Sequence, residues 1–218
     1  MRSVRLAVLG YGNVGSALAR AARAAGHDVT FADNPANPGA ADATVAGDPR
    51  LRGVAVAPAP DAIARADLVI VALPFGVVAE AIPPLAPALA GKAVIDATNP
   101  VGPGLAHALG GTSGAARVAA AAPGAGVVKA FNIYGAENLG GLPIAPGAPR
   151  PLMPYAGDDV PAKATAAEFI AGLGWEPMDA GPLSAALDLE HLALLWIRMV
   201  RMGGVDGHLV WSALRWAP

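Results

Sequence analysis

The chain has 218 residues, which is enough for one large domain or for one domain with a smaller appendage. Its net charge of −2 lacks the basic excess typical of nucleic-acid-binding proteins, and the absence of cysteine excludes a disulfide scaffold, a thiolate nucleophile and a cysteine-ligated metal. Hydrophobic residues make up 54% of the chain, yet its longest apolar stretch, 68–79, is bounded by Asp67 and Glu80 and contains Pro74, so we expect no membrane-spanning helix.

The N-terminal segment carries the clearest pattern in the chain. Residues 4–9 are a short apolar run, typical of a strand buried on both faces, and they lead into the GxGxxG sequence Gly10-Tyr11-Gly12-Asn13-Val14-Gly15. Apolar residues at helical spacing follow as far as Gly26, and residues 27–32 predict a second strand that ends at Asp33. The basic residues and apolar stretch at the start imitate a signal peptide, but the spacing of the glycines favours a strand, turn and helix that bind a dinucleotide.

Each glycine of this loop has a distinct expected role. Gly10 permits the tight turn, Gly12 lets a pyrophosphate approach the backbone, and Gly15 lets the helix pack closely on the strand. The unpaired N–H groups at the helix N-terminus would bind the phosphates, with Tyr11, Asn13 and Val14 in the same cofactor-binding loop. The alternative is a strand–helix–strand unit that has a glycine turn and no ligand.

The end of the second strand indicates which dinucleotide would bind. A carboxylate such as Asp33 accepts hydrogen bonds from both ribose hydroxyls and repels a 2′-phosphate. Asn34 follows it, and residues 34–38 contain no basic group that could hold a phosphate, so the pattern favours NAD. Asp33 could instead serve only as a turn or cap residue.

The next part of the chain predicts three more buried strands, each closed by a turn. We expect these strands over residues 67–74, 93–100 and 127–132. The other expected elements are an irregular crossover over 35–60 with weak strand character at 54–57, a helix over 77–90 broken near Pro83, a helix over 105–109, and an ambiguous segment over 118–126.

The carboxyl ends of parallel strands line the ligand crevice of such folds. The residues there that could position a nicotinamide are Pro74, Phe75, Asn99, Pro100, Lys129 and Asn132, and Leu73 and Pro74 are also candidates for binding the cofactor. Each also has a structural explanation: Asn99-Pro100 is a common turn signal, Phe75 could belong to the core, and Lys129 could be a solvated charge at the rim.

The C-terminal part begins with residues 139–154, a glycine- and proline-rich stretch that predicts a linker or a lid over the cleft. A strand over 152–157, a helix over 162–173 and a short strand over 175–178 are expected next. The last helix, 183–202, is apolar on more than one face and must therefore be buried. We expect it to form a homodimer interface; the alternative is that it packs only on its own nucleotide domain.

Taken in order, these motifs resemble one known family over nearly the whole chain, the NADP oxidoreductases that depend on coenzyme F-420, an 8-hydroxy-5-deazaflavin. The reductase domain of the STEAP proteins is similar as well. The resemblance rests on residues 10–15, 66–75, 95–100, 127–132, 135–139, 155–159, 175–183 and 192–197.

The resemblance implies a Rossmann domain over 1–138 and a small C-terminal domain over 139–218, often in a dimer. It also implies hydride transfer between a nicotinamide and a flavin-like ring, which needs proximity and orientation more than an acid–base residue. Two segments depart from the family. NADP-using members carry Ser or Thr and then Arg where this chain has Asp33-Asn34, and Leu187 and His191 replace an Arg and a Pro near the start of the last helix.

We therefore expect an α/β protein with a doubly wound, mostly parallel sheet, acting in the cytoplasm as an NAD(P)-dependent oxidoreductase. Its expected reaction is hydride transfer between the dinucleotide and a deazaflavin such as coenzyme F-420, or a flavin. No metal site is expected, because the four histidines are scattered without ligand spacing. The alternatives are a reductase of another small molecule, such as an imine or a carbonyl compound, and a non-catalytic dinucleotide sensor.

Overall fold

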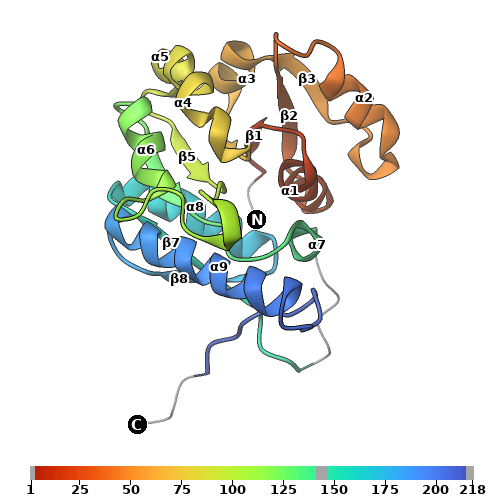
Figure 1. Ribbon diagram of the computed structural model, residues 1–218. Coiled ribbons are helices and arrows are strands. Elements are labelled where there is room, and N and C mark those ends of the chain that lie inside the picture. Colours follow the sequence, from red (N-terminus) through yellow and green to blue (C-terminus); the bar gives the residue numbers. More distant parts are fainter. Residues whose placement is uncertain (1–2, 141–146, 215–218) are drawn as a thin grey trace.

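Eight strands form one sheet in the computed structural model, which describes residues 3–140 and 147–214 (Figure 1). The strand order is β3-β2-β1-β4-β5-β6-β7-β8, and all neighbours are parallel except β6 and β7. The strands are β1 (Arg5–Leu9), β2 (Asp28–Asp33), β3 (Ala55–Pro58), β4 (Leu68–Val71), β5 (Ala93–Asp96), β6 (Gly126–Lys129), β7 (Leu152–Gly157) and β8 (Glu176–Asp179).

Helices cover both faces of this sheet. One core joins it to α1, α2 and α8, and the other joins it to α3, α4, α5 and α6. The α-helices are α1 (Asn13–Ala24), α2 (Ala40–Gly47), α3 (Ala59–Arg65), α4 (Val78–Ala81), α5 (Ala86–Leu89), α6 (Gly114–Ala121), α7 (Ala136–Leu139), α8 (Val160–Gly172) and α9 (Ala186–Arg201). The short 3-10 helices are η1 (Pro49–Leu51), η2 (Phe75–Val77), η3 (Pro83–Leu85), η4 (Pro103–Leu105) and η5 (Leu183–Ala185).

The central strand β1 is apolar after its first residue, Arg5, which is exposed at the strand's start. Leu6 and Val8 point into the core beneath α1, whereas Ala7 and Leu9 point into the core on the opposite face. A strand with helices on both sides has no solvent-facing residues, so its sequence does not alternate between apolar and polar. The predicted doubly wound, mostly parallel fold is confirmed.

The segment after β5 differs from the prediction. We expected a helix over 105–109, but only η4 forms there, and Val101 then pairs with His107 in an antiparallel bridge. Gly104 and Leu105 have φ of 66° and 56°, a left-handed backbone that an α-helix cannot continue. The ambiguous segment is resolved by α6, which begins after Ser113, whose hydroxyl accepts a hydrogen bond from the N–H of Ala116 at 3.0 Å.

The C-terminal part extends the sheet, since β7 pairs with β6 and β8 pairs with β7. The predicted linker or lid lies partly outside the described residues, and its last residues belong to β7. The helix α9 packs against β7 and α6 and buries Trp196, while Leu195 stays exposed. Dimer formation through α9 and the division into two domains stay predictions. Within 3–140 and 147–214, no helix is long and apolar enough to cross a membrane.

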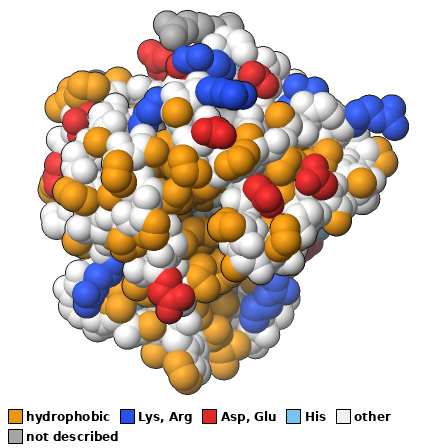
Figure 2. All heavy atoms as spheres, turned by 90° about the horizontal axis from the view of Figure 1, so that it is seen from above, with side chains coloured by type: hydrophobic (Ala, Val, Ile, Leu, Met, Phe, Trp, Pro, Cys, Tyr) orange, Lys and Arg blue, Asp and Glu red, His pale blue; other side chains and the backbone are white. Residues whose placement is uncertain are grey.

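The face of the molecule seen from above in Figure 2 is hollowed near its centre. Hydrophobic side chains line the hollow, and charged side chains of both signs lie around it. This face therefore carries no broad patch of a single charge.

Candidate functional site

The three glycines of the loop between β1 and α1 differ in how closely other atoms surround them. Gly10 has φ of +104°, and a Cβ there would lie 2.5 Å from the carbonyl oxygen of Ala72. A Cβ on Gly15 would overlap the carbonyl oxygen of Gly10, so the close approach of α1 to the strand requires glycine at both positions. A Cβ on Gly12 would meet nothing within 4 Å. The fold therefore needs Gly10 and Gly15, whereas the space beside Gly12 is left open.

The open space lies at a helix N-terminus that no side chain caps. Gly12 is the N-cap residue of α1 and cannot supply a capping side chain, and the first turn of the helix contains no acidic residue. The first N–H groups of a helix have no intrahelical partner and carry a partial positive charge. Backbone donors and an open approach together suit the pyrophosphate of a dinucleotide.

The carboxylate of Asp33 ends β2 beside this loop. Its Oδ1 is buried without a hydrogen-bond partner among the described residues, and the turn is made instead by Asn34, whose Oδ1 accepts from the N–H of Ala36 at 3.0 Å. Tyr11 packs edge-on against Phe31, and burial together with the negative charge of Asp33 raises the pKa of the Tyr11 hydroxyl. Asp33 thus has an unused acceptor where a ribose hydroxyl could bind.

The loop after β4 carries Leu73, Pro74 and Phe75. Pro74 is exposed, and Leu73 and Phe75 are half-buried. The Phe75 ring packs against the backbone of Gly114, where an added Cβ would lie 3.0 Å from a ring carbon. Phe75 is therefore part of the packing between η2 and α6 and still has an exposed part.

The loops after β5 and β6 are joined by a pair of amides. The Nδ2 of Asn99 donates to the backbone carbonyl of Asn132 at 2.7 Å, and the Nδ2 of Asn132 donates to the Oδ1 of Asn99 at 3.0 Å. The Nδ2 of Asn132 also donates to the carbonyl of Leu189 at 3.0 Å, and its own Oδ1 is buried without a partner among the described residues. Pro100 is buried beside them. The two amides hold these loops at a fixed distance, and one acceptor remains available.

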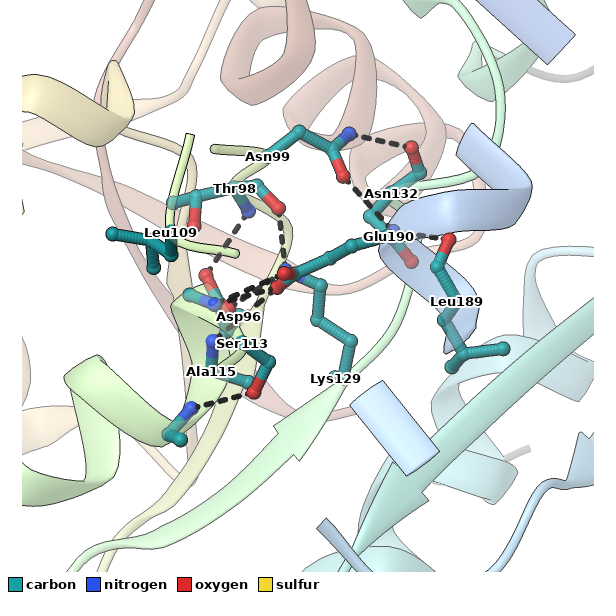
Figure 3. A network of polar contacts seen from close by, with 12 residues as sticks. Asp96, Thr98, Asn99, Leu109, Ser113, Ala115, Lys129, Asn132, Leu189 and Glu190 are labelled. Carbon is teal, nitrogen blue, oxygen red and sulfur yellow. Dashed lines mark hydrogen bonds and ion pairs between the residues drawn. The ribbon is translucent and has the colours of Figure 1, made fainter. Parts of the chain in front are cut away.

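Lys129, at the end of β6, lies inside the protein. Its side chain is 0% exposed, so the alternative of a solvated rim charge is wrong. Its Nζ contacts the carboxylates of Asp96 at 2.9 Å and Glu190 at 2.8 Å and donates to the carbonyl of Thr98 at 2.5 Å (Figure 3). A buried cation must be compensated, and two carboxylates from separate elements provide the compensation.

Glu190 is the centre of this network. Its carboxylate accepts from the backbone N–H of Gly114 at 2.9 Å and of Ala115 at 3.4 Å, so it binds the N-terminus of α6 (Figure 3). Nε2 of His107 lies 2.7 Å from its other oxygen. The backbone N–H of Leu109 donates to Nδ1 of that ring at 3.3 Å, which assigns the proton of the neutral ring to Nε2. No group of His, Asp and Glu among the described residues could hold a metal ion.

The structure therefore brings the predicted residues to one edge of the sheet but adds a layer beneath them that the sequence analysis missed. Asp96, Ser113, Gly114, His107 and Glu190 were not predicted. Two of them carried a signal: Asp96 ends an apolar strand, and Glu190 lies in an apolar helix. An ionisable residue at a position expected to be buried needs an opposite charge, and Lys129 in its own apolar strand was the available one.

Comparison with known proteins identifies similar chains. Residues 5–100 match the family described as NADP oxidoreductase coenzyme F420-dependent. Metalloreductase STEAP3 of Rattus norvegicus is 36% identical over 111 residues, which cover 50% of this chain and 22% of that protein. The matched part is thus about a fifth of the length of that curated relative.

Among the solved structures that match nearly the whole chain, two are also matched over nearly all of their own length. One, described as a candidate F420-dependent NADP reductase from Arthrobacter sp. FB24, is 27% identical with a TM-score of 0.76 and covers 94% of this chain and 97% of its own. A hypothetical protein from Sinorhizobium meliloti is 28% identical with a TM-score of 0.74 and covers 98% and 96%. The resemblance to the coenzyme F-420-dependent NADP oxidoreductase family, a family of NAD(P)-dependent oxidoreductases, is confirmed.

Proposed function

We propose that the protein binds NAD(H) at the carboxyl edge of the sheet and transfers a hydride between the nicotinamide and a flat ring acceptor, a deazaflavin such as coenzyme F-420 or a flavin. The observation that carries the proposal is the contrast among the three loop glycines. Gly10 and Gly15 are crowded by the backbone, whereas Gly12 faces open space at an uncapped helix N-terminus. A turn built only for folding would not need a glycine there.

The proposed cofactor site uses residues already in place. The loop from Gly10 to Gly15, with Tyr11, Asn13 and Val14, would hold the pyrophosphate, and Asp33 with Asn34 would hold the adenosine ribose. The orphaned Oδ1 of Asp33 supports NAD over NADP, because a 2′-phosphate would approach an unneutralised carboxylate.

The nicotinamide end would lie against the loops after β4, β5 and β6. Pro74 and Phe75 would lie along the ring, and the linked amides of Asn99 and Asn132 would fix the carboxamide side. A bound nicotinamide supplies the hydride itself, so the protein has to orient two rings and exclude water rather than provide an acid or a base. Lys129 would support this end of the site without contacting the ring, because its ammonium group is enclosed by acceptors.

The proposed acceptor is recognised by its ring. The tail of coenzyme F-420 is anionic, whereas Lys129 at the carboxyl edge is fully buried and already paired with two carboxylates, and the exposed Arg198 donates to the carbonyl of Leu105 at 2.7 Å. Ring stacking and shape would therefore contribute more to binding than ion pairs with a tail. This is why a flavin stays beside the deazaflavin in the proposal.

The test is to mix the protein with NADH or NADPH and with coenzyme F-420 or FMN, and to follow both the nicotinamide and the ring by their absorbance. We expect oxidation of NADH with bleaching of a ring acceptor, and faster turnover with NADH than with NADPH. Asp33→Ser should lower the NADH-to-NADPH preference about tenfold, equivalent to about 1.4 kcal/mol. The matched control Asp28→Ser changes the carboxylate at the other end of β2 and should leave the preference unchanged.

Three other outcomes would overturn parts of this proposal. Binding of NADH without oxidation by either ring would support a dinucleotide sensor. Oxidation only with an imine or carbonyl compound would replace the acceptor. An unchanged cofactor preference in Asp33→Ser would show that this carboxylate does not contact the ribose.

A further inference from the structure

The buried carboxylate of Glu190 is linked through neighbouring residues to Phe75 and Asn132, two residues at the nicotinamide end of the proposed site. We propose that Glu190 is a positioning residue, which sets the placement of Phe75 and Asn132 without touching the dinucleotide. The proposal rests on the function proposed above. It concerns a residue on α9, the helix that is farthest in sequence from the glycine loop.

Four donors converge on this carboxylate from three separate segments. Lys129 of β6 lies 2.8 Å from Oε1, and the N–H of Gly114 lies 2.9 Å from the same oxygen. The N–H of Ala115 lies 3.4 Å away, and Nε2 of His107 lies 2.7 Å from Oε2. Glu190 itself is 1% exposed. The carboxylate therefore fixes α9, α6 and the loop after β5 relative to β6.

The connection to Phe75 runs through Gly114. A Cβ on Gly114 would lie 3.0 Å from the Phe75 ring and 3.1 Å from Oε1 of Glu190, so the ring and the carboxylate both border the same position beside one glycine. Any shift of Glu190 displaces the first residue of α6. The Phe75 ring, which packs on that residue, then moves with it.

The connection to Asn132 runs through the neighbouring residue of α9. The carbonyl of Leu189 accepts the Nδ2 of Asn132 at 3.0 Å, and the same Nδ2 bonds Asn99 at 3.0 Å (Figure 3). Because Leu189 and Glu190 are consecutive, the ion pair and the amide pair share one turn of helix. The position of that turn therefore determines where the two amides lie.

An amide cannot replace this carboxylate without loss. Oε1 accepts from Lys129 and Gly114, and Oε2 accepts from His107 and Gly114, so both oxygens face donors. A glutamine NH₂ in either place would face a donor with a donor. His107 could turn into an acceptor only by moving its proton to Nδ1, which already accepts from Leu109. The chemistry of the network thus requires the negative charge.

The test compares the Kd of NAD with the Kd of ADP-ribose, which lacks the nicotinamide, by titration calorimetry. Glu190→Gln should raise the Kd of NAD about tenfold and leave the Kd of ADP-ribose unchanged, because one well-formed contact at the nicotinamide is worth about a factor of ten. Asp179→Asn is the matched control, since Asp179 also pairs with a lysine, Lys163, at 2.8 Å and accepts a backbone N–H. It should change neither Kd.

Gly114→Ala is the second variant, in case Glu190→Gln does not fold. Its added methyl presses on Phe75 and Glu190 while improving the intrinsic helix propensity of α6, and it should show the same selective loss of NAD.

Unchanged Kd ratios in a folded Glu190→Gln protein, or in Gly114→Ala if only that variant folds, would show that the network is merely structural. Equal affinity of the wild-type protein for NAD and ADP-ribose would also overturn this inference while leaving the adenosine half of the site intact. Failure of the wild-type protein to bind either compound would instead overturn the proposed function.

Discussion

Replacement of Gly12 by alanine separates ligand binding from folding. The added methyl meets nothing within 4 Å, and the backbone of Gly12, with φ of −73° and ψ of −164°, is allowed for any residue. Alanine lowers the conformational entropy of the unfolded chain, which should stabilise the folded protein by about 0.4–1 kcal/mol. Alanine is also a poorer N-cap residue than glycine, which should cost about 0.5 kcal/mol. The two effects nearly cancel. We therefore expect the Tm of Gly12→Ala without ligand to stay within about 2 °C of wild type.

The same methyl occupies the space through which a pyrophosphate would reach the helix N-terminus. A charge-assisted hydrogen bond from a backbone N–H to a phosphate oxygen contributes about 1.5–3 kcal/mol. Loss of one such bond should raise the Kd of NAD about 10- to 150-fold. Calorimetry gives the Kd directly, and the ligand-induced rise in Tm should fall in parallel because binding stabilises by mass action.

The contrasting variant is Gly15→Ala. Alanine favours a helix by about 1 kcal/mol over glycine, but here its Cβ would overlap the carbonyl oxygen of Gly10. Backbone cannot yield as a flexible side chain does, so we expect a net loss of about 1–3 kcal/mol and a Tm lower by about 2–12 °C. Undiminished binding of NAD by a stable Gly12→Ala protein would refute the assignment of the pyrophosphate to this loop.

Two further predictions concern buried ionisable groups. Lys129→Met leaves the carboxylates of Asp96 and Glu190 facing each other without a cation and should cost about 3–5 kcal/mol in urea denaturation, and a loss below about 1 kcal/mol would contradict the buried ion-pair network. His27 accepts the N–H of Val4 at 3.2 Å, and burial lowers its pKa, so the unfolded chain binds more protons and stability should fall as the pH drops from about 6.5 toward the folded pKa. The free energy of unfolding, measured by denaturation at several pH values across this range, should depend less steeply on pH in His27→Gln than in the wild-type protein. An identical dependence on pH would exclude His27 as its cause.

The fold could be predicted because its signals are local. Buried parallel strands are short apolar runs, and turn residues close each of them, so residues 67–74 and 93–100 were placed close to β4 and β5. The glycine loop was equally local, since three glycines within six residues define it. The wrong prediction, the helix over 105–109, also had a local cause: the left-handed backbone of Gly104 and Leu105 outweighed an apolar spacing that covers barely one turn.

The lower layer of the site could not be predicted in the same way. Glu190 and Gly114 are 76 residues apart, and the partnership depends on how α9 crosses the sheet. A charged residue within an apolar run indicates that a partner exists but does not identify it. Only the requirement that buried charges be paired would have connected Lys129 with two carboxylates, and pairing alone does not show that a helix N-terminus and His107 join them.

Only 15% of the residues of the chain are charged, and several of these charges belong to the buried network. Asp96, Lys129 and Glu190 are all buried, so part of the scarce charge lies beneath the carboxyl edge rather than on its surface. Charges held in this way are occupied by buried partners and are not exposed to an ionic ligand, but they fix the positions of the elements above them. A site of this kind would select the proposed flat ring by placement and shape. Coenzyme F-420 and FMN both carry an anionic tail and differ in their rings, so the parallel assay with these two acceptors tests whether the ring determines which of them is reduced.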